Sequence, residues 1–296
     1  MPCDGRKKGS PGGTLPAFGK GNPVAAPGWF CWAACMDQHA VLAAFDEQIR
    51  RHPEPDAPDD TIEYDDRVVR QISARGGWTG VTWSGLDQAS ADAVIAAQVS
   101  RFAELSRDWE WKHYSYDQPS DLPGRLLAAG FLPQPAEALL VAEIADLTLD
   151  VPPPSGVELA AVTGQHGTDA LVQVHDQVFG GDHSAAGETL LAALARQSPA
   201  AAAVVAMAGQ TPVSAGRVEF HAGTDFASLW GGGTLPAWRG RGVFRSLVAF
   251  RAALASARGF RYLQVDASAD SRPILRRLGF AELATTTPYT YPCGAS

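Results

Sequence analysis

A glycine-rich turn between a strand and a helix constrains the fold of this chain more than any other feature of its 296 residues. The turn reads Arg-Gly-Arg-Gly over residues 239–242, after an apolar strand predicted at 226–230 and before an amphipathic helix that begins at Val243. Glycine lets the backbone turn tightly and approach a ligand closely. The amides of a first helical turn lack partners within the helix and attract an anion. The turn therefore predicts a binding site for a pyrophosphate group.

Two familiar phosphate-binding motifs do not fit this segment. It lacks the Lys-Ser/Thr ending with which a P-loop holds a terminal phosphate and its magnesium ion. It also lacks the G-x-G-x-x-G fingerprint of dinucleotide-binding domains. The pyrophosphate is therefore expected to belong to a different kind of ligand.

The elements after the turn make the pattern more specific. Apolar residues recur at helical spacing from Val243 to Leu254, with Arg245, Arg251 and Arg258 on other faces. Gly259 is a helix stop. A strand is then predicted over 262–267 and a helix over 271–278, which ends in Gly-Phe at 279–280.

This order of elements resembles the GNAT superfamily of N-acetyltransferases, whose acetyl-CoA loop has the pattern Arg-x-x-Gly-x-Gly/Ala. Arg239 and Gly242 match its first two fixed places, and Phe244 stands where Gly or Ala is usual. Phe244 either narrows the approach to the phosphates or points inward to the core. The alternative interpretation of the segment is a glycine-rich turn in another kind of α/β domain.

The resemblance implies an α/β (α+β) fold in which a mixed, mostly antiparallel sheet is flanked by helices. A shift of 149 places brings Asp117 onto Asp266 and the Gly-Phe pair at 130–131 onto that at 279–280, which is either a weak internal repeat or chance identity. We expect two GNAT-like domains in tandem. The predicted boundaries are a disordered tail over 1–30, a degenerate N-terminal domain over 31–149, a Pro-rich linker over 150–156 and the acetyltransferase domain over 157–296.

The first of these domains lacks the anion-binding turn. Its main helix is predicted over 86–105, and Asp87 at the helix start is able to cap the helix but repels a phosphate. We therefore expect the first domain to bind no CoA and to serve as a platform or as one wall of the substrate site. The remaining helices are predicted over 31–51, 122–129, 168–179 and 187–197, and the remaining strands within 68–84, 109–117, 138–144, 157–161, 203–221 and 282–291.

The resemblance also implies which residues contact acetyl-CoA. Backbone amides of the loop would hold the pyrophosphate, the strand before it would pair with the pantetheine arm, and one amide near Leu235 would polarise the thioester carbonyl. Leu275 stands in place of the family's Tyr that protonates the leaving thiolate, so that Tyr289, Tyr291 or water would replace it. The implied cofactor-binding residues are Gly233, Thr234, Leu235, Arg239, Gly240, Arg241, Gly242, Val243, Phe244 and Ser268.

Three residues are candidates for the base that removes a proton from the acceptor amine. Glu219 and His221 lie two apart near the end of a predicted strand and therefore on one face. Asp266 ends the strand beyond the helix. The alternative for Glu219 and His221 is a solvated strand face.

The composition indicates which classes of partner and which cellular compartment to expect. The chain has 24 basic and 32 acidic residues and a net charge of −8, which argues against nucleic acid or an anionic membrane as a partner. It contains no apolar run long enough for a membrane span and no secretory signal, so we expect a cytoplasmic protein. Cys31, Cys35 and His39 would share a helix face, but a fourth ligand is not evident and we expect no metal.

Together these observations predict a cytoplasmic, acetyl-CoA-dependent N-acetyltransferase that acts on a primary amine of a small molecule or a peptide. Phe244 and Leu275 motivate an alternative, an acyl-CoA-binding sensor or interaction module that is catalytically weak or inactive. A third interpretation gives both domains scaffold roles only.

Overall fold

The computed structural model describes residues 36–74, 77–195 and 200–294, which belong to one compact unit. The predicted tail over 1–30, Cys31 and Cys35 lie outside the described residues.

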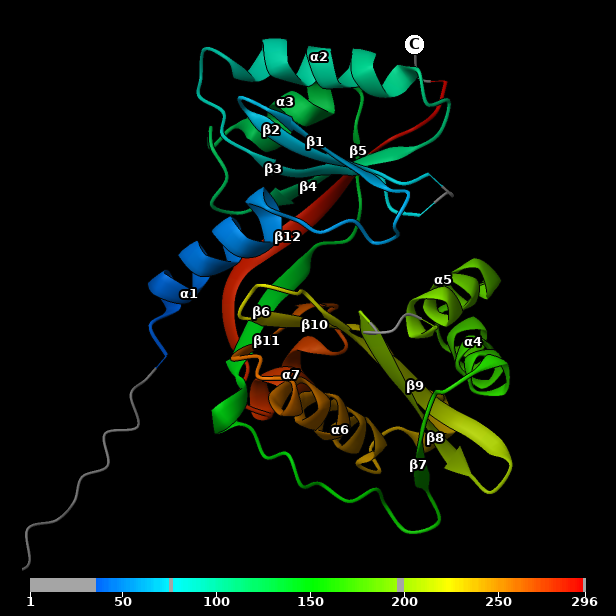
Figure 1. Ribbon diagram of the computed structural model, residues 1–296. Coiled ribbons are helices and arrows are strands. Elements are labelled where there is room, and N and C mark those ends of the chain that lie inside the picture. The colour runs from blue at the N-terminus through cyan, green and yellow to red at the C-terminus, as the bar shows by residue number, and fades with distance from the viewer. Residues whose placement is uncertain (1–35, 75–76, 196–199, 295–296) are drawn as a thin grey trace, which may run out of the picture. The chain divides into compact units, whose positions relative to one another are not determined.

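The described strands form one mixed sheet (Figure 1). Their order is β1-β2-β3-β4-β12-β6-β11-β10-β9-β8-β7, and β5 pairs with β12. Only the pairs β3–β4 and β10–β11 are parallel, so the expected mixed and mostly antiparallel sheet is confirmed. The strands are β1 Thr61–Asp65, β2 Val68–Ile72, β3 Gly80–Ser84, β4 Trp109–Tyr114, β5 Leu132–Pro133, β6 Glu137–Glu143, β7 Glu158–Ala161, β8 Ala201–Ala208, β9 Thr211–Phe220, β10 Phe226–Thr234, β11 Tyr262–Ala267 and β12 Ala281–Tyr291.

Helices flank this sheet. The longest are α2, α4 and α6, and a π-helical turn continues α1. The helices are α1 Gln38–Phe45 with η1 Asp46–Arg51, α2 Ala91–Ala103, α3 Leu122–Ala128, η2 Ile144–Asp146, α4 Gln165–Phe179, α5 Ser184–Leu194, η3 Pro236–Trp238, α6 Val243–Ala257 and α7 Arg272–Arg277.

The two halves of the chain exchange strands at the centre of the sheet. The last strand, β12 (red in Figure 1), pairs with β6 through residues 281–286 and with β4 through residues 286–291. In turn β6, from the first half, pairs along its whole length with β11 of the second half. The apolar run of β6 suits this central position, because Leu139, Leu140 and Val141 are fully buried between layers on both faces.

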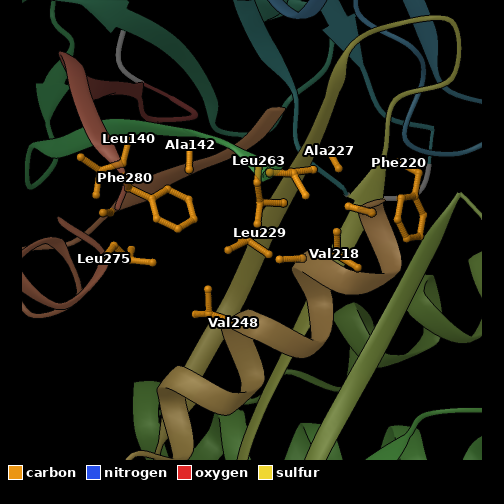
Figure 2. Packing of buried hydrophobic residues seen from close by; sticks show 14 of the residues in the cluster. Leu140, Ala142, Val218, Phe220, Ala227, Leu229, Val248, Leu263, Leu275 and Phe280 are labelled. Carbon is orange, nitrogen blue, oxygen red and sulfur yellow. The ribbon is translucent and has the colours of Figure 1, made fainter. Parts of the chain in front are cut away.

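Buried apolar clusters hold the helices on the sheet. Figure 2 shows side chains of α6 and α7, such as Val248 and Leu275, directed toward Leu140, Leu229 and Leu263 of the central strands. On the opposite face, α1 packs through Val41 and Phe45. In the first half, Phe102 of α2 stacks on Trp109, and Tyr289 of β12 completes the same cluster.

Two helix starts that sequence periodicity placed too early follow an aspartate whose side chain accepts backbone amides. The helix predicted from residue 31 begins at Gln38, because the carboxylate of Asp37 accepts the amides of His39 and Ala40. The helix predicted from residue 86 begins at Ala91, because the carboxylate of Asp87 accepts the amides of Ala89 and Ser90. The sequence analysis also missed β1, which is a short edge strand.

Two expected absences concern the described residues only. Among them, no helix combines the length and the apolar character needed to cross a membrane. The same residues contain no group of three or more His, Cys, Asp and Glu side chains placed to hold a metal ion.

Candidate functional site

The glycine-rich turn leads from β10 through η3 into α6. Gly240 and Gly242 adopt φ angles of +72° and +89°, which disfavour any residue with a side chain. A Cβ atom at either position would meet no other atom within 4 Å, so the turn faces open space. The side chain of Arg239 bends back and donates from Nε to the carbonyl of Thr234 at 3.0 Å, while Arg241 stacks over Trp238.

The first backbone donors of α6 have no partner among the residues that the structure describes. No side chain caps this helix, and Ser246 is the first residue whose amide bonds back, to the carbonyl of Gly242 at 3.2 Å. The approach to α2 in the first half is different, because the carboxylate of Asp87 lies just before this helix and accepts the amides of Ala89 and Ser90 in the preceding turn. An anion therefore finds unsatisfied donors at α6 and a negative charge at α2.

Beside this turn, β10 separates from its neighbour β11. The two strands pair only through residues 226–228 and 262–264, whereas β10 continues to Thr234 against β9 alone. The register of β10 shifts between Trp230 and Gly233, which marks a β-bulge. The described part of β10 beyond Ser228 therefore presents an edge without a strand partner on the β11 side.

The direction of the donors along this edge shows which amide near Leu235 is free to meet a ligand. The amide of Leu235 donates to the carbonyl of Val213 at 2.9 Å, so it is not the free amide expected near this position. Donors alternate in direction along a strand. The amide of Thr234 consequently points to the open edge, where the carbonyl of Thr234 also receives Arg239.

Two side chains of α6 lie beneath the bulge. A Cβ atom on Gly232 would lie 3.1 Å from Cε2 of Phe244 and 3.5 Å from Nη2 of Arg251. Phe244 packs against the central apolar cluster, so its ring points inward. Arg251, which the sequence analysis placed on a face other than the apolar one, is 1% exposed. Its spacing of four from the buried Leu247 was the signal for this burial.

The predicted bases share the face of the sheet opposite α6. Ser228 aligns with Glu219 and Gln264, and Trp230 aligns with Arg217, so these side chains form two adjacent rows. Glu219 accepts a hydrogen bond from Arg217 Nε at 2.8 Å. Asp266, two residues after Gln264, pairs with Lys112 Nζ of β4 at 2.5 Å.

His221 lies just beyond the end of β9 and reaches the same face. Its Nε2 is 2.7 Å from the hydroxyl of Ser228. Burial lowers the pKa of His221, so its imidazole is neutral at pH 7. A neutral imidazole is able to accept a proton, as the sequence analysis required of this candidate.

Four further polar groups at this face escaped the sequence analysis. Lys112 Nζ lies 5.6 Å from the centre of the Trp230 indole ring, and Arg217 lies 5.8 Å from it on the same strand pair. The indole N–H of Trp230 is buried and has no hydrogen-bond partner among the described residues. Asp56 lies in the loop before β1 and accepts a hydrogen bond from Gln71. Burial and the charge of Glu219 raise the pKa of Asp56 to about 6. The carboxylate keeps contact with solvent.

His175 of α4 contacts the bulge from the same side. Its Nε2 lies 2.8 Å from the carbonyl of Gly231, which fixes Nε2 as the protonated nitrogen. Burial lowers the pKa of His175 to about 4, so the ring is neutral. A Cβ on Gly231 would lie 2.7 Å from this ring, which explains the glycine there.

The position of the family's acid is apolar, and Ser268, which was expected to contact the cofactor, lies at the surface. Leu275 is buried in the central cluster, and Ser268 is exposed and hydrogen-bonded to Ser271. Tyr289 and Tyr291 pair with β4 and pack in the core of the first half, so neither replaces the missing Tyr.

A pocket of about 280 Å³ lies beside α6. Arg245, in the first turn of α6, and Arg277, at the end of α7, supply its cationic groups. Val248, Ala249, Ala252 and Leu278 form apolar walls, and the segment at 147–151 closes one side.

Comparisons with known proteins agree on the fold. No family model matches this chain, and no curated protein matches its sequence. A solved GCN5-related N-acetyltransferase from Kribbella flavida is 20% identical, with a TM-score of 0.62 over 87% of this chain and 95% of that one. A tandem GNAT protein from the clavulanic acid biosynthesis pathway is 13% identical, with a TM-score of 0.59 over 88% and 95% of the two chains. A GCN5-related N-acetyltransferase from Sphaerobacter thermophilus is 14% identical, with a TM-score of 0.52 over 84% and 92%.

Proposed function

Because this chain has the fold of the GCN5-related N-acetyltransferases, we propose that it transfers an acetyl group from acetyl-CoA directly to a primary amine of a small molecule or peptide. The observation that carries the proposal is the meeting of two free donor sets, the uncapped start of α6 and the open edge of β10. One set suits a pyrophosphate and the other an extended amide-bearing chain. CoA carries both groups in that order.

The donor site is built mainly from backbone. The amides at 240–245 hold the pyrophosphate, and the open edge of β10 pairs with the pantetheine arm at Thr234, because the backbone groups of Gly233 face β9. The amide of Thr234 is placed to donate to the thioester oxygen. Arg245 and Arg277 face the nucleotide end, whose 3′-phosphate and adenine match the two cations and the apolar walls of the pocket.

The acceptor site is the polar face around Trp230. Asp56, Glu219 and Asp266 give it more negative than positive groups beside Lys112 and Arg217, which favours a cationic amine. Bound acetyl-CoA supplies an activated acyl carbon. Glu219, through a water molecule, takes the proton that the ammonium must lose. The amine nitrogen then bonds to the acyl carbon, the carbon–sulfur bond breaks, and the second nitrogen proton passes through water to the thiolate.

Only the second half of the chain is proposed to bind the acyl donor. We assign residues 31–149 to a degenerate GNAT-like domain and residues 157–296 to the acetyltransferase domain, with the linker at 150–156. Asp87 closes the start of α2 to phosphate, while Lys112 and Asp56 bring the first half to the acceptor face. The first half is thus one wall of the acceptor site.

Two measurements test this proposal. Calorimetric titration with acetyl-CoA is expected to give saturable binding, and thiol release with a panel of cationic and neutral amines is expected to give turnover with the cationic ones. Absence of binding contradicts the donor site. Binding without turnover across a broad panel favours a second candidate, an acyl-CoA sensor, for which the buried Leu275 in place of an acid is the supporting observation.

A further inference from the structure

Arg251 is a buried cation beneath the bulge of β10. Its side chain is 1% exposed, and Nε donates to the carbonyl of Leu247 within α6 at 3.1 Å. Its Nη1 donates to the carbonyl of Arg217 at 3.1 Å and, over 3.5 Å, to that of Trp230. Arg217 and Trp230 are the last paired residues before the register shifts. The guanidinium therefore donates hydrogen bonds to both β9 and β10 at the point where the bulge begins.

Of two glycines beside this side chain, only Gly216 leaves space that a Cβ atom would take from it. A Cβ on Gly216 of β9 would lie 2.6 Å from Nη1 of Arg251, and a Cβ on Gly232 of β10 would lie 3.5 Å from Nη2. Neither glycine has a positive φ angle, so backbone conformation does not explain them. A side chain at position 216 would therefore displace the guanidinium from its present place.

The charge of Arg251 has no counter-ion among the described residues. Burial alone acts on it and lowers its pKa to about 10, so the group stays cationic at pH 7. Nη2 makes no hydrogen bond to a described residue and is directed toward Gly232. Burial of a cation without a partner costs free energy of folding. The charge of Arg251 is therefore expected to interact with a nearby group that becomes negative.

We propose that Arg251 is a positioning residue that holds the bulge of β10 and polarises its peptide groups toward the thioester oxygen. A carbonyl that accepts a hydrogen bond makes the N–H of the same peptide group a stronger donor. Through Trp230, Arg251 acts in this way on the peptide group that leads into Gly231, within the bulge that precedes the Thr234 amide. Its positive field, little screened in the interior, stabilises the negative charge that develops on the oxygen at the open edge. This inference rests on the proposed function.

Three substitutions separate the charge from the packing. Arg251→Lys keeps the charge, Arg251→Gln keeps donors to the carbonyls without the charge, and Arg251→Met fills the space with apolar atoms if the Gln variant fails to fold. The readouts are the calorimetric Kd for acetyl-CoA, the infrared stretch of the ¹³C-labelled thioester carbonyl when bound, and kcat for an amine that the wild type accepts.

The neutral variants are expected to bind acetyl-CoA within about threefold of wild type. Their bound carbonyl stretch is expected to return toward the value of free acetyl-CoA, and their kcat to fall about tenfold to a hundredfold, less than for loss of a direct oxyanion donor. Arg251→Lys is expected to retain most of both signals. An unchanged carbonyl stretch in a folded neutral variant overturns the inference.

The same experiment separates this inference from the proposed function. If the wild type binds acetyl-CoA but acetylates no amine, transfer is refuted, and the carbonyl stretch still decides the role of Arg251. If the wild type does not bind acetyl-CoA, both proposals are overturned together. If the wild type is active and kcat and the carbonyl stretch are the same in all variants, only the inference about Arg251 is overturned.

Discussion

Lys112 and Asp266 form an ion pair that joins β4 of the first half to β11 of the second, with Nζ and Oδ2 2.5 Å apart. The side chain of Asp266 is 2% exposed and that of Lys112 is 19% exposed. Burial opposes the charge of Lys112, but the carboxylates of Asp266 and Glu110, with Tyr114 nearby, outweigh it and raise the pKa of Lys112. The ion pair therefore joins the two halves of the chain at the acceptor face.

Removing one member of this pair is expected to destabilise the protein. Lys112→Met leaves the buried carboxylate of Asp266 without its cation, which we expect to lower the free energy of unfolding by about 3 kcal/mol. The double variant with Asp266→Leu is expected to recover much of the loss. Urea unfolding measures both. Arg51→Met, which breaks an exposed pair with Glu47, is the control and is expected to cost less than about 1 kcal/mol; an equal loss in the control contradicts the prediction.

Gly242→Trp is expected to abolish binding of acetyl-CoA, because the indole would fill the open space before the free amides of α6. A side chain at its φ of +89° also costs about 1–2 kcal/mol of stability. Gly259→Trp is the matched control, since Gly259 has a φ of +85° and equally open surroundings at the other end of α6. Calorimetric binding is expected to survive in the control. Binding retained by Gly242→Trp would refute the placement of the pyrophosphate.

Arg245 and Arg277 are expected to recognise the 3′-phosphate of CoA. The double variant to Ala is expected to weaken CoA binding about tenfold, in line with loss of charge-assisted hydrogen bonds, and to leave 3′-dephospho-CoA binding nearly unchanged. Arg276→Ala is the control, because Arg276 is a neighbouring exposed arginine that does not line the pocket. Equal weakening for the two ligands places the phosphate elsewhere.

Glu219→Gln is expected to lower kcat about a hundredfold, the usual contribution of a general base, while the KM for acetyl-CoA stays near its wild-type value. Steady-state thiol release at pH 7 measures both constants. Glu158→Gln is the control, because it removes an equal charge on the edge strand β7, far from β10. It is expected to leave kcat and KM unchanged. A kcat within twofold of wild type for Glu219→Gln excludes this residue as the base.

The buried imidazole of His175 is expected to make stability depend on pH. Burial lowers its folded pKa to about 4, with Arg217 and His183 acting in the same direction and Asp176 against it. The unfolded chain, with a pKa of about 6.5, takes up the proton first as the pH falls. His175 therefore lowers the free energy of unfolding between pH 6.5 and 4, by about 3 kcal/mol at the acidic end.

His175→Gln isolates this contribution, because the Gln amide is able to donate to Gly231 as the imidazole does. Urea unfolding across this pH range is expected to give a flatter dependence for the variant, since His221 and all carboxylates are common to both proteins. Parallel curves for the two proteins would remove His175 as the cause.

The local signals in the sequence identified the centre of the fold. The turn before Val243, the periodicity of α6 and the bounds of β11 follow from chemistry between near neighbours, and the structure places these elements as expected. Contacts across the two halves, such as that of Lys112 with Asp266, have no local signature. The burial of Arg251 was not predicted because a cation is ordinarily solvated, whereas the distant Gly216 leaves space for it in the interior. The start of α2 was misplaced because one carboxylate overrides an apolar period.

The exchange of β6 and β12 has a consequence for biosynthesis. Neither half has all of its neighbours in the sheet until residues 281–291 have left the ribosome, because β12 lies between β4 and β6. Until then, β4 and β6 each expose an apolar edge to other nascent chains. A premature stop before residue 281 would therefore leave two incomplete sheets rather than one intact domain and one fragment.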